Sequence, residues 1–157
     1  MKLPSDREMI TAQMHLQLRE LMATQRLAVL ATQSEEQPYC SLVAFVVSSD
    51  LKHLFFATAR HTRKYANLAD HSRVALLVDN RSGEDTDFHE AMAATAVGEA
   101  EEVQEDAFVS ARALYLAKQP HLVDFVDSPT CALLCVKVQT YYVVTRFQQV
   151  VEYHVAP

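Results

Sequence analysis

Three strand-like segments follow one another early in the chain, separated only by short polar turns. The segments cover residues 27–32, 39–47 and 53–58, and the turns cover residues 33–37 and 48–50. Antiparallel strands can be joined by turns this short, whereas parallel strands need a crossover of about a dozen residues or more. Long βαβ alternation is absent, so the succession predicts a mainly antiparallel sheet.

The rest of the chain adds strands and a few helices to this pattern. Further strands are predicted at residues 74–78, 91–103, 132–144 and 147–155. Apolar residues at helical spacing predict helices at residues 5–24, 62–69 and 105–119. The first helix opens with the capping pattern Ser5-Asp6-Arg7-Glu8. We expect a mainly β, α+β fold: a single domain spanning residues 1–157, an antiparallel barrel of six or seven strands with flanking helices. The helix within residues 1–25 is expected to pack on the barrel.

Charge limits the partners of the molecule. The 157 residues carry a formal net charge of −6, so the protein should repel nucleic acid and anionic membranes, and we expect neither as a partner. The charge is unevenly placed, since residues 52–73 hold five Lys or Arg against the single acid Asp70. Residues 79–106 hold ten acids against Arg81 alone. A locally basic site in an acidic protein points to a small anion.

Cellular location is suggested by the start of the chain and by its cysteines. Residues 1–8 lack the pattern of a signal peptide, and the apolar runs are far shorter than the roughly 18 residues that span a bilayer. Cys40, Cys131 and Cys135 are odd in number and lie in apolar settings, which is typical of reduced core thiols. We therefore expect a cytoplasmic protein.

The stretch FFATARHTRK, residues 55–64, collects hydroxyls and cations where a predicted strand ends. Thr58 and Thr62 supply hydroxyl donors, Arg63 a planar fork and Lys64 a compact charge, beside the free amides of a helix start. The chain has only Gly83 and Gly98, which excludes the glycine-rich phosphate loops. Side chains would therefore have to bind a phosphate. A solvated basic helix start is the alternative that spacing alone leaves open.

Metal and cysteine chemistry find little support. The histidines match no compact ligand pattern; those considered are His61, His71, His89 and His154. Residues 79–90 have the length of a calcium loop, but Glu84 stands where glycine is required. Cys40 lies in an apolar strand, a setting that raises the pKa of a thiol and disfavours a nucleophile. We expect no metal site.

Residues 38–78, PYCSLVAFVVSSDLKHLFFATARHTRKYANLADHSRVALLV, resemble the FMN-binding split-barrel family of pyridoxamine 5′-phosphate oxidase-like proteins. In that family a strand beneath the flavin is followed by a strand ending in an aromatic-x-Thr turn. A Ser/Thr-Arg-Lys phosphate clamp then opens a helix, and a strand of the RVALLV type follows. All four parts occur here in order. The segments YLAKQP (115–120) and RHTRK (60–64) also resemble a branch that includes haem-utilisation proteins.

The resemblance implies an FMN site within a homodimer. Three residues would line the isoalloxazine, mostly through backbone groups: Ser41, Leu42 and Val43. Two would contact the flavin or its ribityl chain: Ala57 and Thr58. The phosphate would be bound by Thr62, Arg63 and Lys64, with His61 as a weaker candidate. The site would lie at a two-fold interface, where the partner's Asn80 and Arg81 are candidates to complete it.

Departures from the oxidase pattern limit the implied activity. Tyr39 stands in place of a phosphate-binding Arg, and Ala93 in place of a Gln. The chain has no Trp and no Arg after Arg146, so the substrate elements of the oxidase are missing. We therefore expect an FMN-dependent oxidoreductase that uses a small-molecule electron donor and acceptor and is not a true pyridoxamine phosphate oxidase. The alternatives are a non-catalytic module that binds FMN, or haem with His154 as a guessed ligand, and a structural dimer without a cofactor.

Overall fold

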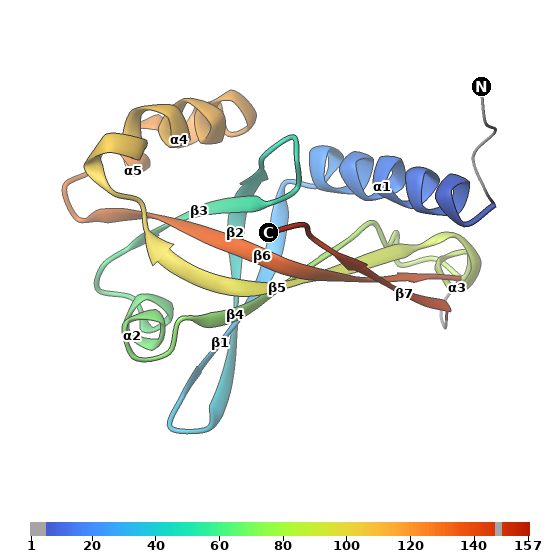
Figure 1. The fold of residues 1–157 in the computed structure, drawn as a ribbon. Coiled ribbons are helices and arrows are strands. Elements are labelled where there is room, and N and C mark those ends of the chain that lie inside the picture. Colours follow the sequence, from blue (N-terminus) through green and yellow to red (C-terminus); the bar gives the residue numbers. More distant parts are fainter. Residues whose placement is uncertain (1–5, 147–148) are drawn as a thin grey trace.

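The computed structural model describes residues 6–146 and 149–157, with side chains from residue 11 onward. Its strands are β1 (Leu27–Ser34), β2 (Gln37–Val47), β3 (His53–Ala59), β4 (Arg73–Asp79), β5 (Met92–Glu102), β6 (Cys131–Thr145) and β7 (Gln149–His154). Their order is β3-β2-β1-β4-β5-β6-β7, and the further pairing of β3 with β6 closes a six-stranded barrel (Figure 1). All these pairings are antiparallel, and β7 lies outside the barrel on the edge of β6. The predicted fold class is confirmed.

Helices cover the ends and one side of the barrel (Figure 1). They are α1 (Asp6–Thr24), α2 (Arg63–Asp70), α3 (Asp87–Glu90), α4 (Glu105–Lys118) and α5 (Val123–Val126), with a 3₁₀ turn at Pro120–Leu122. The helices α1, α2 and α4 agree with the predicted ones to within about a residue. The single-turn elements were not predicted, because one turn is too short to show an apolar period. Of the described helices, none is long and apolar enough to cross a membrane.

A few predictions concern residues outside the described ranges. The capping pattern near the N-terminus is one, since Ser5 and the side chains of residues 6–8 are not described. The first two residues of the predicted strand 147–155 are another.

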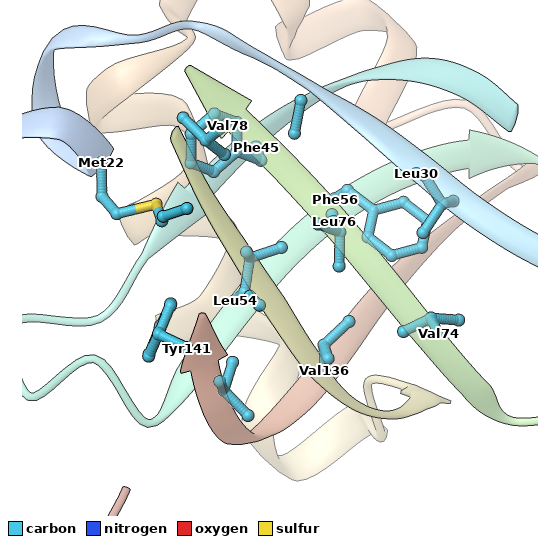
Figure 2. Packing of buried hydrophobic residues seen from close by; sticks show 14 of the residues in the cluster. Met22, Leu30, Phe45, Leu54, Phe56, Val74, Leu76, Val78, Val136 and Tyr141 are labelled. Carbon is cyan, nitrogen blue, oxygen red and sulfur yellow. The ribbon is translucent and has the colours of Figure 1, made fainter. Parts of the chain in front are cut away.

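Alternation along the strands fills the barrel. Phe45, Leu54, Phe56, Leu76 and Val136 point inward and are fully buried (Figure 2). Helix α1 contributes to the same core through Met14, Leu18, Leu21 and Met22. A second apolar cluster lies outside the barrel, where the α4 residues Ala111 and Tyr115 pack on Val46, Ala57 and Leu133. Because burying apolar surface stabilises by about 25 cal/mol per Å², this second cluster fixes α4 against β2, β3 and β6.

The cysteines differ from the prediction in one respect. All three are free thiols, but Cys40 is exposed, and Cys131 and Cys135 are only partly buried. None belongs to the barrel interior, because each lies on the outward face of its strand. The prediction of core thiols was therefore wrong, since apolar neighbours in a strand do not tell which face a residue occupies.

Two tight backbone features shape the sheet. Glu35 and Glu36 form the β1–β2 turn with φ values of 50° and 66°. This turn is shorter than the predicted one. The prediction missed its length because acidic residues are not a signature of left-handed turns. In β5 the register shifts between Val97 and Gly98. A Cβ built on Gly98 would lie 2.1 Å from the carbonyl oxygen of Lys137, so this bulge needs glycine.

Candidate functional site

Strands β2 and β3 part halfway along their length. Their pairing covers Val47↔Leu54, Val46↔Phe55 and Phe45↔Phe56, and goes no further. Beyond that point β3 continues to pair with β6 up to Ala59↔Cys131, while β2 continues to pair with β1 to the end of the hairpin. The barrel is therefore split along one seam, which we call the β2–β3 split. Among the strands of residues 6–146 and 149–157, none pairs with the backbone edge of β2 that faces this split.

A pair of threonine hydroxyls closes the end of β3. The Oγ1 atoms of Thr58 and Thr62 are 2.8 Å apart, and the Thr62 hydroxyl also donates to the Ala59 carbonyl at 2.9 Å. Thr62 is the N-cap of α2 and accepts a long hydrogen bond from the amide of Tyr65. Thr58 is 1 % exposed, so its hydroxyl orients Thr62 from inside. The first turn of α2 thus begins just after the end of β3, and its free amides and the positive end of its dipole lie at that end of the helix.

The two cations of the predicted clamp follow directly. The guanidinium of Arg63 lies over the ring of Tyr39, with its central carbon 5.4 Å from the ring centroid. Arg63 therefore reaches from α2 to β2 across the end of the split. Lys64 is partly buried and His61 is exposed. No residue among those described pairs with Arg63 or Lys64 through an ion pair, which leaves both charges available to an anion.

A third cation, Arg60, is already neutralised. Its guanidinium forms an ion pair with Glu102 of β5 and donates to the hydroxyl of Tyr65 at 3.0 Å. The Tyr65 hydroxyl in turn donates to Glu102 at 3.2 Å. The hydrogen bond from Arg60 holds the pKa of Glu102 below its usual value, and the same bond raises the pKa of Arg60. This network ties α2 to β5, and sequence spacing could not find it because Glu102 is 42 positions from Arg60.

The predicted flavin-lining residues of β2 occupy two faces. Leu42 points outward and is 66 % exposed, whereas Val43 belongs to the barrel core. Ser41 lies on the inward side, and among the described residues its buried hydroxyl has no hydrogen-bond partner. Ala57 is buried on the outward face of β3. Contacts of Val43 and Ala57 with a ligand would therefore have to come from their backbone.

Asn80 and Arg81 lie away from the clamp of their own chain. They follow the end of β4, whereas α2 precedes its start, so the length of a seven-residue strand separates them, about 20 Å. Asn80 accepts a hydrogen bond from the amide of Met92 at 2.7 Å, and Arg81 pairs with Asp79 at 3.0 Å. Within one chain they cannot join the clamp, so their predicted role would require a partner subunit.

Tyr115 of α4 reaches the split from outside. Its hydroxyl donates to the carbonyl of Ala44 at 3.2 Å, and its side chain belongs to the same apolar cluster as Ala57. Burial raises the pKa of Tyr115 to about 12, so the phenol is protonated at neutral pH. The segment YLAKQP drew attention in the sequence, but only the structure shows what this tyrosine contacts.

Other reactive groups are not prepared for chemistry. Burial raises the pKa of Cys131, and it raises that of Cys135 to about 11, so both thiols stay protonated at neutral pH. Within the described side chains, no group of three or more His, Cys, Asp or Glu is placed to hold a metal. A cavity of about 430 Å³ lies beside the Arg60–Glu102 pair and is lined partly by Phe108 and Cys131.

Comparison with known proteins agrees with the split-barrel fold. The family model described as pyridoxamine 5′-phosphate oxidase matches residues 14–145, whereas no curated protein matches. The structure resembles a haem-binding protein from Mycobacterium smegmatis, with a TM-score of 0.78 and 20% identity over 98% of this chain and 60% of that one. It also resembles a protein related to general stress protein 26, of the pyridoxinephosphate oxidase family, from Clostridium acetobutylicum (TM-score 0.69, 16% identity, 91% and 95% covered). A FAD-binding protein from Mesorhizobium loti is similar as well (TM-score 0.65, 15% identity, 82% and 91% covered). At these identities the solved structures establish the split-barrel fold alone, while the family model covers most of the sequence: the chain belongs to the pyridoxamine 5′-phosphate oxidase family.

Proposed function

We propose that the protein is an FMN-binding flavoprotein, and that it acts as an oxidoreductase on a small-molecule electron donor and acceptor. The observation that carries this proposal is the position of the clamp at the end of the β2–β3 split. The N-terminus of α2 with the Thr62 hydroxyl follows the end of β3, and Arg63 reaches the Tyr39 ring on β2, where the pairing of β2 with β3 has ended. Among the described residues, no ion pair neutralises Arg63 or Lys64. A ligand in which a short chain joins an anionic group to a flat heterocycle would match a cationic helix start beside an unpaired strand edge.

The donor set fits FMN better than a dinucleotide. Thr62, Arg63 and Lys64 supply the hydrogen bonds and charges that one terminal phosphate needs. Arg60, the nearest further cation along the chain, is already paired with Glu102 and is therefore not free to bind a second phosphate. The orphan hydroxyl of Ser41 lies on the strand that would face the ring system and offers it a buried polar group.

Each element would have a distinct task when FMN is bound. The flavin supplies hydride or electron transfer, which no side chain can provide. The clamp would orient it by its phosphate, and the backbone of β2 at Val43 and of β3 at Ala57 would contact the flavin, because both side chains are buried within the protein. We assign no catalytic acid or base, since the protonated thiols and Tyr115 are unsuited to proton abstraction at neutral pH.

A homodimer with FMN at the subunit interface is part of the proposal. The outward side chains of β1, β2, β4 and β5 form an apolar surface, which we call the outer face: Val29, Ala31, Leu42, Ala75, Leu77, Ala93 and Val97. These side chains belong to neither core cluster. Exposed apolar patches of this kind usually mark a protein–protein interface, so the outer face is the proposed dimer contact. Asn80 and Arg81 lie at one end of this face, where they could reach the site of a second copy.

A haem-binding module without turnover is the second candidate, because one similar structure is a haem-binding protein. His154 gives it little support as a ligand. One ring nitrogen of His154 lies 3.2 Å from the Thr140 hydroxyl, and the other lies 3.2 Å from a Glu152 oxygen. The two candidates differ in the spectrum they produce: flavin bands for the first, a Soret band on haem addition for the second.

The test is the absorbance of the purified protein, followed by titration with FMN. We expect flavin bands or uptake of added FMN, and reduction of the bound flavin by a nicotinamide donor without oxygen. The double variant Arg63→Ala/Lys64→Ala should bind FMN at least about 100-fold more weakly, because each charged contact contributes about 1.5–3 kcal/mol. The control Arg73→Ala/Lys137→Ala removes the same charge from exposed strand positions and should bind like the wild type.

Two results would count against the proposal. A protein that takes up no FMN would exclude the flavoprotein, and a wild-type affinity in the clamp variant would exclude the assigned site. Bound flavin that no physiological donor reduces would favour the non-catalytic module.

A further inference from the structure

The hydroxyl of Tyr115 lies where β2 and β3 begin to part. The last paired residues are Phe45 and Phe56, so Ala44 and Ala57 would form the next pair if the ladder continued. Instead, the Tyr115 hydroxyl donates to the Ala44 carbonyl at 3.2 Å, and Tyr115 belongs to the same outer apolar cluster as Ala57. A side-chain hydroxyl therefore occupies the place of the missing rung.

The direction of the backbone carbonyls shows which edge of β2 faces β3. Successive carbonyls of a strand point to alternate sides. The Phe45 carbonyl accepts a hydrogen bond of 3.3 Å from the side-chain amide of Gln119, and the same amide donates to the Arg26 carbonyl at 3.0 Å, just before β1. The Ala44 carbonyl therefore points toward β3, and so does the peptide edge of Leu42, two residues further along.

The hydroxyl is held firmly in this position. Tyr115 is 1 % exposed and packs in the outer apolar cluster with Val46 and Ala57. The end of α4 is anchored by buried Gln119 and by Lys118, whose ammonium donates to the Met22 carbonyl at 2.7 Å. Because helix and strands are both fixed, the spacing of Ala44 and Ala57 is set from outside the barrel.

We propose that Tyr115 is a positioning residue for the flavin ring. Its hydroxyl keeps β2 and β3 apart, so that the Leu42 backbone edge stays unpaired and available to the hydrogen-bonding edge of the isoalloxazine. The inference rests on the proposed FMN site. Tyr115 itself need not touch the flavin, since it acts through Ala44 and Ala57.

The decisive variant is Tyr115→Phe, which keeps the ring and removes only the hydroxyl. The strands then either close on each other or leave the Ala44 carbonyl without its hydrogen-bond partner, and both outcomes change the Leu42 edge. We expect FMN to bind at least tenfold more weakly and the visible circular dichroism of bound FMN to change. Binding is measured well below the unfolding midpoint, so that a purely structural loss of stability leaves it unchanged. The control Tyr153→Phe, on the outer strand β7, should bind like the wild type.

Two further measurements separate the inference from the function on which it rests. Hydrogen exchange without FMN should differ between wild type and Tyr115→Phe at the amides of Ala44 and Ala57, whether or not the protein binds flavin. If Tyr115→Phe does not fold, 3-fluorotyrosine placed at position 115 should give a ¹⁹F resonance that shifts on FMN addition. A folded variant with wild-type affinity and an unchanged dichroism spectrum overturns the inference, as does unchanged exchange or an unshifted resonance. Failure of the wild type to bind FMN overturns the proposed FMN-binding function. In that case, amide hydrogen exchange of wild type and Tyr115→Phe still tests whether Tyr115 keeps β2 and β3 apart.

Discussion

The guanidinium of Arg63 lies over the ring of Tyr39, 5.4 Å from its centroid, and so links the first turn of α2 to β2. Cation–π contacts at exposed sites are worth about 0.5–1 kcal/mol. The contact directs Arg63, which is still exposed to solvent, toward β2 at the end of the split. Tyr39 stands where the resemblance to the oxidase places a phosphate-binding arginine, and it would support the proposed clamp through Arg63.

Replacing Tyr39 should therefore weaken FMN binding through the aromatic face alone. Tyr39→Ala is expected to lower the affinity about two- to fivefold, the equivalent of the lost contact. Tyr39→Phe keeps the ring and should bind within about twofold of the wild type in the same fluorescence titration. Equal losses in both variants would mean that the phenol hydroxyl, and not the ring, matters.

Charge placed on the outer face should separate the proposed dimer. Leu77 points outward from β4 and lies in neither core cluster. We expect Leu77→Glu to elute as a monomer in size-exclusion chromatography with light scattering, because an interface would have to bury the new carboxylate. The monomer should also bind FMN weakly. Val109→Glu is the matched control, since Val109 is 77 % exposed on α4, away from this face. If Leu77→Glu remains a dimer, the subunit interface lies on another surface.

The bulge at Gly98 should not tolerate a side chain. A Cβ at this position would lie 2.1 Å from the oxygen and 2.8 Å from the carbon of the Lys137 carbonyl. Relief of that clash must move backbone, so Gly98→Ala should lower the free energy of unfolding by about 2–4 kcal/mol in urea titrations. Gly83→Ala is the comparison: Gly83 has φ +84°, but a Cβ there would meet no atom within 4 Å, so only backbone strain of about 1 kcal/mol is expected. Similar losses in both would contradict the steric argument.

Lys118 should make stability depend on pH in the alkaline range. Its ammonium is half-buried over the Phe45 ring, and burial, followed by the charge of Arg26, lowers its pKa to about 8. In the unfolded chain a lysine titrates near pH 10.4, so between about pH 8 and 10.4 the unfolded state binds more protons. The free energy of unfolding contributed by this group therefore rises with pH across that window. After allowance for solvent screening, the rise is on the order of 1 kcal/mol.

The measurement is the difference in unfolding free energy between wild type and Lys118→Met at pH 7 and pH 10. The wild type should gain on the variant at the higher pH, whereas Lys137→Met, at an exposed position of β6, should show no such change. A difference that stays constant, or that falls as pH rises, would show that burial does not depress this ammonium.

Local residues were sufficient to predict several parts of the site. Thr62 as the start of α2, with Arg63 and Lys64 in its first turn, follows from short-range capping chemistry and was predicted from the residues around the strand end. The strand succession likewise implied antiparallel pairing. The exposed Cys40 was not predicted, because an apolar run of residues does not reveal which strand face the helices cover.

The sequence by itself determined the elements, their antiparallel order and the local cluster of hydroxyls and cations, since each depends on interactions between residues close in the chain. Only the tertiary structure decided that Arg60 is neutralised by Glu102, that Tyr39 lies under Arg63, and that Tyr115 stands between β2 and β3. Those contacts join residues 24 to 71 positions apart, and no local pattern encodes them. They arise because closing the barrel and burying α4 against it bring distant strands and helices together.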